Sequence, residues 1–221
     1  MELRAENISR RYFRKYGEAN FFEAVHPVSL TLESGKLTVL NGKSGSGKTT
    51  LLHMLAGLLR PSEGKVFLDN TDLYALEDGK LSRLRNQRIG VVPQGRSAVD
   101  SLTVYENILL PGFIYSSALR TEEAENWMEA LGISALRDAM PAELSGGELR
   151  RMAIARTLSG SPDVILADEP TGDLDDENTV IVLTALQQAV RDGRAVLVVS
   201  HEADAEDYAD QVYHMDNGTI R

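Results

Sequence analysis

Residues 42–49 of the chain read Gly42-Lys43-Ser44-Gly45-Ser46-Gly47-Lys48-Thr49. This stretch fits the pattern G-x-x-x-x-G-K-[ST] at every required position. It stands between residues 38–40, which are typical of a buried strand, and residues 49–56, which have the apolar spacing of a helix. The glycines let successive backbone amides point at one anion, and the positive end of the helix dipole adds to their field. The sequence therefore predicts a phosphate-binding loop between a strand and a helix.

Two side chains of this loop have separate expected roles on a bound nucleotide. We expect Lys48 to reach the β- and γ-phosphates and the Thr49 hydroxyl to bind Mg²⁺. The rest of the loop, together with Thr50 in the first turn of the helix, is expected to hold the phosphates. The predicted ligands are therefore a nucleoside triphosphate, taken as ATP, and Mg²⁺.

A pair of carboxylates follows a second apolar segment. Residues 164–167 predict a buried strand that ends in Asp168-Glu169. Such a strand places Asp168 beside the phosphate loop, where a carboxylate can hold the Mg²⁺ shell. Glu169 is one residue further and points elsewhere, which suits a base that polarises an attacking water. The pattern predicts a site for hydrolysis as well as for binding.

The composition of the chain excludes several classes of protein. The chain has 221 residues, of which 43% are hydrophobic and 25% charged, as expected for a soluble globular domain. A net charge of −10 argues against broad binding to DNA or RNA. The absence of cysteine excludes disulfides and zinc-thiolate sites. No apolar run approaches the roughly 20 residues that span a bilayer, so we expect a cytoplasmic protein that meets a membrane only through a partner.

The pattern along the chain alternates between strands and helices. We expect strands at residues 2–9, 28–32, 36–40, 65–68, 90–92, 164–167, 195–200 and 211–215. We expect helices at residues 48–56, 103–110, 121–131, 147–158 and 177–190. Apolar strands that alternate with helices imply a mainly parallel sheet covered on both faces. We therefore predict one domain over residues 1–221, in which an α/β core (1–96 and 159–221) receives a helical insertion at about residues 97–158.

Further motifs complete a resemblance to a known family. They are Leu144-Ser145-Gly146-Gly147-Glu148 at a helix start, Gln94 after a short strand, Gly172-Asp173-Leu174-Asp175, and His201 after residues 198–200. With the phosphate loop and Asp168-Glu169, these motifs resemble the signature, glutamine loop, D-loop and switch histidine of the ATP-binding cassette (ABC) ATPases, in that family's order. The match covers essentially the whole chain.

The resemblance implies a fold and a set of roles. The fold is the phosphate-loop ABC cassette, with an N-terminal antiparallel β portion and an inserted helical subdomain. Gln94 touches Mg²⁺ or the attacking water, and His201 contacts the γ-phosphate. The signature residues Ser145, Gly146, Gly147 and Glu148 bind the nucleotide of a facing subunit, and Asp175 orders the junction between the two subunits. Tyr12 stacks on adenine, although Phe13 and Tyr16 stand close enough in sequence to be alternatives.

Three positions depart from the family pattern. The signature ends in Glu148 rather than glutamine, the D-loop begins with Gly172 rather than serine, and Pro93 stands where phenylalanine is common. None of these changes removes a catalytic group, so hydrolysis is still expected.

Residues 168–175 and 102–111 are similar to those of the lipoprotein-releasing, macrolide-export and peptide-antibiotic-resistance group. This implies a motor subunit that dimerises on ATP, with a homodimer as the expectation. It would drive a separate membrane permease, an exporter or lipoprotein-release system, from the inner face of the cell membrane. Residues 94–107 would meet the permease, and no nucleic acid is expected as a partner. The alternative is a non-transport ABC ATPase that acts in cell division or on nucleic acid.

Overall fold

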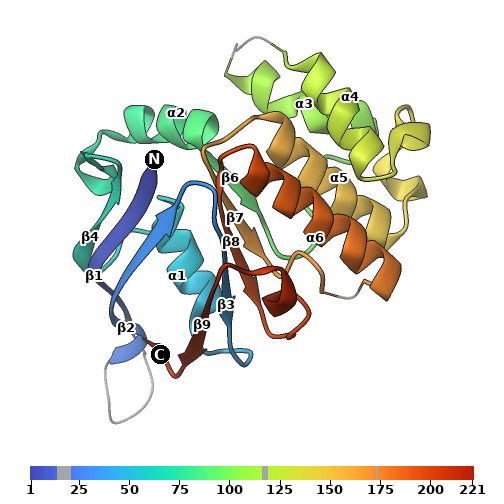
Figure 1. Cartoon of the computed structure of the whole chain (residues 1–221). Coiled ribbons are helices and arrows are strands. Elements are labelled where there is room, and N and C mark those ends of the chain that lie inside the picture. Colours follow the sequence, from blue (N-terminus) through green and yellow to red (C-terminus); the bar gives the residue numbers. More distant parts are fainter. Residues whose placement is uncertain (14–20, 116–118, 173) are drawn as a thin grey trace.

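The computed structural model describes residues 1–13, 21–115, 119–172 and 174–221. Two sheets stand side by side with a helix between them, and a group of helices covers the far face of the second sheet (Figure 1). The helices are α1 (Lys48–Leu55), α2 (Asp78–Arg88), α3 (Val104–Ile114), α4 (Thr121–Ala130), α5 (Gly146–Ser159) and α6 (Asp176–Arg191). Short 3₁₀ turns lie at Leu73–Ala75, Ser134–Leu136, Pro141–Glu143 and Glu206–Tyr208.

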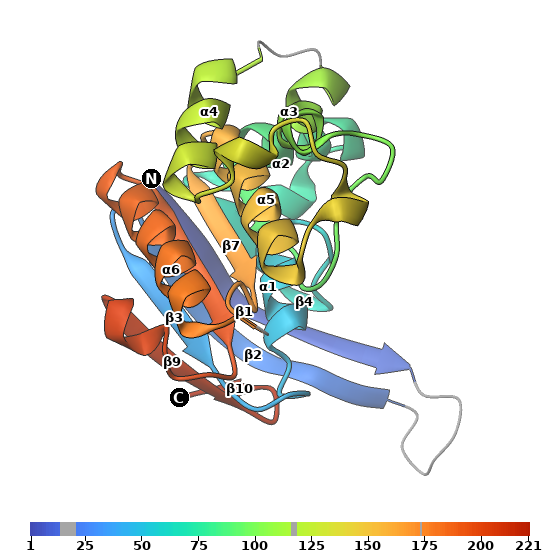
Figure 2. The ribbon, with the colours of Figure 1, turned by 90° about the vertical axis from the view of Figure 1, so that its right-hand side faces the viewer.

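The first sheet is antiparallel and has the strand order β2-β1-β4-β5. Its strands are β1 (Glu2–Phe13), β2 (Phe21–Glu33), β4 (Glu63–Leu68) and β5 (Thr71–Asp72). On β1 the buried residues Leu3, Ala5 and Ile8 face the core. The far ends of β1 and β2 form a ribbon that projects from the body of the molecule (Figure 2), with Tyr12 paired to Phe22 and Phe13 to Phe21.

The second sheet carries the ends of the strands that build the site. Its order is β10-β9-β3-β8-β7-β6, from β3 (Leu37–Asn41), β6 (Ile89–Val92), β7 (Val164–Asp168), β8 (Ala195–Ser200), β9 (Gln211–Asp216) and β10 (Thr219–Ile220). The pairs of β3 with β8 and β9, and of β7 with β6 and β8, are parallel, whereas β10 runs antiparallel to β9. The carboxyl ends of β3, β7 and β8 therefore meet at one edge of the sheet.

Successive side chains of the central strands point to opposite faces of the sheet, as in any β-strand, and they belong to two different hydrophobic clusters. Val196 and Val198 of β8 belong to the cluster under α5 and α6, whereas Leu197 and Val199 belong to the cluster around α1. Helix α1 lies between the two sheets and contributes four side chains that are 0% exposed, namely Leu51, Leu52, Met54 and Leu55. The strands are apolar on both faces because both faces are covered.

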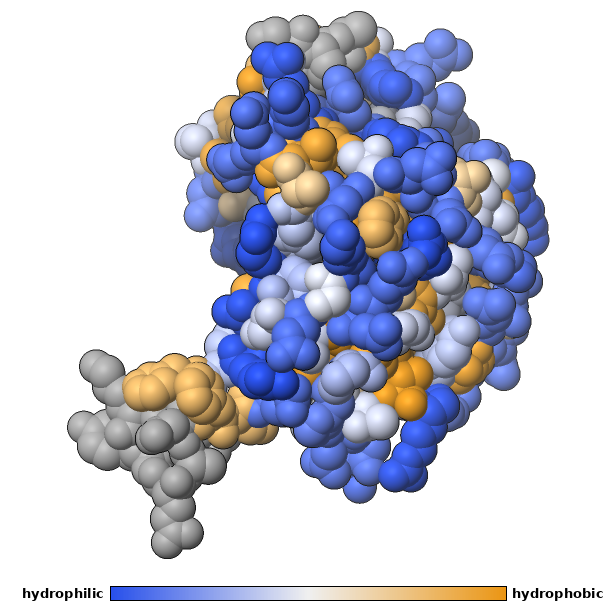
Figure 3. Space-filling model, turned by 90° about the vertical axis from the view of Figure 1, so that its left-hand side faces the viewer, coloured by the Kyte–Doolittle hydropathy of each residue, from blue (hydrophilic) through white to orange (hydrophobic). Residues whose placement is uncertain are grey.

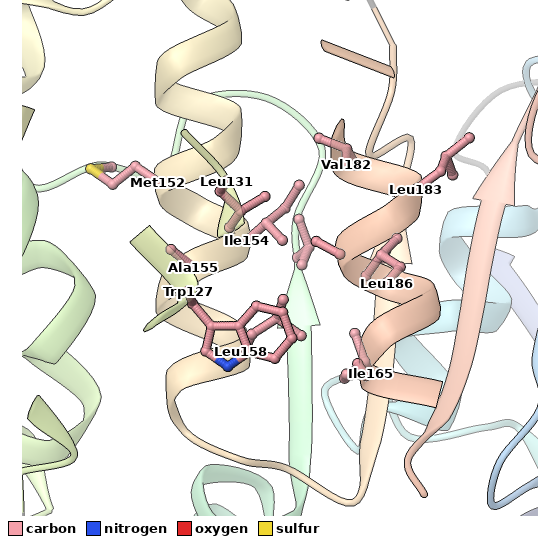
Figure 4. Packing of buried hydrophobic residues seen from close by; sticks show 14 of the residues in the cluster. Trp127, Leu131, Met152, Ile154, Ala155, Leu158, Ile165, Val182, Leu183 and Leu186 are labelled. Carbon is pink, nitrogen blue, oxygen red and sulfur yellow. The ribbon is translucent and has the colours of Figure 1, made fainter. Parts of the chain in front are cut away.

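The cluster beneath the helices ties the helical part of the chain to the sheet. Figure 4 shows side chains of α4, α5, α6 and β7 converging in one layer. The labelled residues are Trp127, Leu131, Met152, Ile154, Ala155, Leu158, Ile165, Val182, Leu183 and Leu186. Because this cluster also includes residues of β3 and β8, the helices and the sheet share one continuous core.

The predicted fold class is confirmed, while several elements differ in extent. Helix α2 was not expected, because only Leu81 of its eleven residues is buried and it presents no apolar stripe. Strand β2 begins at Phe21, well before the predicted start at residue 28. Helix α3 continues past Pro111 to Ile114. The division into an α/β core and a helical insertion stays a prediction.

Candidate active site

The phosphate loop joins β3 to α1 and packs closely against the backbone of neighbouring strands. A Cβ atom added to Gly42 would lie 2.3 Å from the carbonyl oxygen of Met215, and one added to Gly47 would lie 2.3 Å from that of Ala24. Gly47 also has a φ of 106°, and Gly45 has a φ of 80°. The loop therefore needs glycine for close approach at Gly42, for backbone conformation at Gly45, and for both at Gly47.

Lys48 is buried at the start of α1, with its ammonium group inside the loop. It donates hydrogen bonds to the carbonyl oxygens of Gly42 and Lys43, the latter at 3.1 Å. Its Nζ also lies 4.0 Å from Oε1 of Glu169. Burial lowers the pKa of Lys48, and the charges of Glu169 and Asp168 oppose this effect. The loop thus directs a cation toward the predicted position of the phosphates.

Asp168 ends β7 and is 1% exposed. Burial raises the pKa of its carboxyl group, and a hydrogen bond from the Thr49 hydroxyl opposes the rise. Its Oδ1 is buried and has no hydrogen-bond partner within the described ranges. Carboxylate and hydroxyl oxygens are ligands that Mg²⁺ prefers, and an orphaned carboxylate oxygen fits a cation. The described residues offer no cluster of three His, Asp or Glu side chains that could hold a metal. The predicted ligand Gln94, phosphates and water would therefore supply the other ligands.

Glu169 lies between Lys48 and His201. Its Oε2 is 2.8 Å from Nδ1 of His201, a residue that directly follows β8. The hydrogen bond and the negative charge of Glu169 raise the pKa of His201. Glu169 has a φ of 50°, an uncommon conformation for a residue other than glycine, and its amide donates to the carbonyl oxygen of Val199 at 2.8 Å. This backbone turns its carboxylate away from that of Asp168 and toward the histidine.

One open cavity of about 330 Å³ collects residues from distant parts of the sequence. The predicted residues that line it are Tyr12, Ser44, Gly45, Gly47, Lys48, Thr49, Thr50, Gln94 and Glu169. Phe22 and Ala24 of β2 complete the lining and were not predicted. The structure thus brings the phosphate loop, the predicted base-stacking residue and the glutamine together.

The signature residues lie at a different place from the cavity. None of Ser145, Gly146, Gly147 and Glu148 lines the cavity. Ser145 caps α5, since its Oγ accepts from the Glu148 amide at 3.3 Å while the Glu148 carboxylate accepts from the Ser145 amide at 2.7 Å. The backbone amide of Ser145 is thus taken up by Glu148, while Gly146, the first residue of α5, is exposed at the surface.

The other residues expected at a subunit junction adjoin the signature. A Cβ atom added to Gly147 would lie 3.5 Å from the side chain of Leu174. Asp175 caps α6 by accepting from the amide of Asn178 at 2.8 Å. Asp173 of the predicted D-loop lies outside the described residues, as does Tyr16, one of the alternatives to Tyr12.

Arginines of α5 hold the segment that contains Gln94. Arg150 donates to the carbonyl oxygen of Pro93 at 2.9 Å, and Arg156 donates to that of Ser97 at 2.8 Å. The buried Asn107 accepts from the amide of Val99 at 2.8 Å. We did not predict these contacts, because side-chain bonds to backbone carbonyls leave no pattern in the sequence. Helix α5 therefore connects the signature at its start with the Gln94 segment along its side.

Comparison with known proteins gives full-length matches. A family model described as ABC transporter matches residues 25–172. The chain is 35% identical over 221 residues to YvrO of Bacillus subtilis, an uncharacterized ABC transporter ATP-binding protein, with 99% of this chain and 95% of that protein covered. It is 36% identical over 220 residues to LolD of Aquifex aeolicus, a lipoprotein-releasing system ATP-binding protein, with the same coverage.

Solved structures agree with these matches. A dimeric structure of MJ0796, an ABC transporter cassette that is known from Methanocaldococcus jannaschii, superposes with a TM-score of 0.90 at 31% identity. The match covers 99% of this chain and 96% of that one. A second dimeric structure of MJ0796, in a post-hydrolysis state bound to ADP and Pi, gives a TM-score of 0.89. The chain therefore belongs to the ABC transporter family, as an ATP-binding cassette that hydrolyses ATP and serves as the motor subunit of a transporter.

Proposed function

We propose that this cassette works as one of a pair, and that each of its ATP sites is completed by the partner. The observation that carries this proposal is the separation of the two sites within one chain. The cavity has the phosphate loop, Gln94 and Glu169, but it has none of the signature residues. Gly146 is exposed at the start of α5, and a helix start is the usual binding place for a phosphate. A second copy facing the first would bring each signature to the γ-phosphate of the other.

The residues of the cavity take separate roles in this proposal. Lys48 and the loop amides bind the phosphates, and Tyr12 stacks on the adenine. Glu169 accepts a proton from the attacking water. His201, held by Glu169 at 2.8 Å, orients that carboxylate and contacts the γ-phosphate.

Mg²⁺ would be held by Thr49 and Asp168, with Gln94 beside it. The orphaned Oδ1 of Asp168 supports this assignment. When bound, the cation supplies charge neutralisation on the β- and γ-phosphate oxygens. The chain's own contribution is to fix the oxygen donors in a buried position next to the phosphate loop.

The partner in the membrane is a separate permease. In the described part of the chain, no helix is long and apolar enough to cross a bilayer. The similarity to LolD, which is named for lipoprotein release, supports an export or release system at the inner face of the cell membrane. Residues 94–107 would contact the permease. This segment begins at Gln94, and hydrogen bonds from α5 fix the backbone on either side of that residue. The helical insertion at about residues 97–158 would then carry motion between the permease and the ATP site.

Purification of the tagged chain from detergent-solubilised membranes tests this proposal. We expect a polytopic membrane protein to co-purify and to raise the ATPase rate, whereas added DNA leaves that rate unchanged. Loss of the membrane protein together with an ATPase that DNA stimulates would instead establish the non-transport alternative.

A further inference from the structure

We propose that Arg10 is a positioning residue for the aromatic wall that receives the base of the nucleotide. The inference rests on the proposed ATP site and concerns the part of it that Tyr12, Phe22 and Ala24 line. Arg10 and Tyr12 are two residues apart on β1, so their side chains share one face of the strand. The Arg10 guanidinium carbon lies 4.8 Å from the centre of the Tyr12 ring, within the range of a cation–π contact.

The guanidinium of Arg10 is itself fixed from the other side. Its Nη1 donates to the carbonyl oxygen of Arg60 at 2.9 Å, in the loop that follows α1. Its Nε is buried without a hydrogen-bond partner, and within the described ranges no carboxylate forms an ion pair with it. Among the described residues, the contacts of the Arg10 guanidinium are therefore with a ring and a carbonyl oxygen rather than with a carboxylate. It links the ring of Tyr12 to the loop at the end of the helix that begins with Lys48.

The position of Arg10 leaves the other side of the Tyr12 ring for a ligand. Tyr12 lines the cavity of the phosphate loop, whereas Arg10 does not. The contact of the guanidinium with the ring therefore lies outside the cavity lining. Fixing an aromatic side chain in advance lowers the entropy lost when a base stacks on it. Arg10 would act on the nucleotide through Tyr12, without touching it.

Phe22 extends the same wall from the neighbouring strand. It is the cross-strand partner of Tyr12 in the β1–β2 ribbon, and it also lines the cavity. Figure 3 shows apolar side chains gathered on this projecting ribbon. Beyond the phosphate loop, the lining residues on β1 and β2 are Tyr12, Phe22 and Ala24, none of which carries a carboxylate or an amide side chain.

Binding of ADP and of pyrophosphate, measured by titration calorimetry on the purified chain, separates this role from a general effect on the site. ADP has a base, pyrophosphate has none, and neither depends on hydrolysis. We expect Arg10→Met to weaken ADP binding by about three- to fivefold, the factor of one cation–π contact, with pyrophosphate binding unchanged. Arg10→Lys should retain most of the affinity, because it keeps a cation over the ring.

The matched control is Arg11→Met, because Arg11 stands next on the same strand but pairs with Glu23 and Glu63 instead. It should bind both ligands as the wild type does. Phe22→Leu supplies an independent variant from the other strand and should also weaken only ADP. Wild-type ADP affinity in Arg10→Met, or an equal loss of ADP and pyrophosphate, would overturn the inference. A wild-type chain that binds neither ligand would overturn the proposed ATP site itself.

Discussion

The Glu169 carboxylate joins the ends of two strands through a contact with His201, whose Nδ1 lies 2.8 Å from its Oε2. Glu169 follows β7 and His201 follows β8, and these strands are paired in the sheet. The same carboxylate lies 4.0 Å from Lys48 through its other oxygen. One side chain thus contacts both the phosphate loop and the histidine, which suits a base whose position depends on what the loop binds.

Replacing this base should separate binding from turnover. We expect Glu169→Gln to lower the steady-state ATPase rate at least about 100-fold, the usual size of a general-base contribution. ATP binding should persist, because Lys48 and the loop amides are unchanged. Glu129→Gln, a matched change at an exposed residue of α4, should hydrolyse ATP normally. The assignment of the base is wrong if Glu169→Gln turns over at the wild-type rate.

The contact between Glu169 and His201 should make stability depend on pH in one direction. The hydrogen bond and charge of Glu169 raise the pKa of His201 above its ordinary value of 6.5. The charged imidazole is therefore favoured in the folded state, and its contribution is complete below pH 6.5 and lost as pH rises through the folded pKa. The melting temperature of the wild type should exceed that of His201→Gln by more at pH 6 than at pH 9. A difference in melting temperature that stays the same at both pH values would contradict this prediction.

A substitution of Ser145 should weaken ATP-driven dimerisation more than it weakens ATP binding by the monomer. We expect Ser145→Ala to bind ATP almost as the wild type does, because Ser145 does not line the cavity. Dimerisation driven by ATP, measured by light scattering in the Glu169→Gln background, should weaken. The lost helix cap also costs about 1 kcal/mol of folding free energy. Ser145→Thr keeps a capping hydroxyl and serves as the control, and loss of ATP binding by the monomer would refute the prediction.

Glu148, where the family usually has glutamine, should oppose the closed dimer. Its carboxylate accepts from the Ser145 hydroxyl at 2.7 Å, which lowers its pKa, so it is charged at neutral pH. That charge would lie near the phosphates of the facing subunit. Glu148→Gln keeps the capping box and should tighten ATP-driven dimerisation by roughly two- to fivefold, as expected for about 0.5–1 kcal/mol between partly exposed charges. Weaker dimerisation in this variant would show that the carboxylate is needed.

Two glycines of the phosphate loop provide a matched pair. Gly45 and Gly47 both have positive φ, but only Gly47 lacks room for a Cβ atom, which would lie 2.3 Å from the carbonyl oxygen of Ala24. Gly45→Ala should cost about 1–2 kcal/mol of stability from its backbone alone. Gly47→Ala should cost more and abolish ADP binding. Stability is measured by chemical denaturation and ADP affinity by titration. If Gly45→Ala and Gly47→Ala lost equal amounts of both, the contact with Ala24 would be unimportant.

Local patterns predicted the parts of the site that follow directly from a strand end. The phosphate loop follows β3 and Asp168 ends β7, and the parallel register of both strands with β8 brings them together. Their roles in the reaction remain predictions. The resemblance to a known family predicted Gln94 and His201. In the structure Gln94 lines the same cavity as Lys48 and Glu169, and His201 contacts Glu169.

Features that depend on distant contacts were not predictable in the same way. Phe22 reaches the cavity only through its register with Tyr12 across the ribbon. Helix α2 has a polar sequence, because it packs against the rest of the molecule mainly through Leu81. Arg156 bonds to the backbone of Ser97, a partner that no residue pattern specifies.

The enclosure of α1 between two sheets limits how far this helix can move. With Leu51, Leu52, Met54 and Leu55 all 0% exposed, this helix cannot shift without opening both neighbouring sheets. We therefore expect α1 to keep its position between the sheets when nucleotide binds and leaves. Larger displacements would then fall to the helices on the outer face of the second sheet.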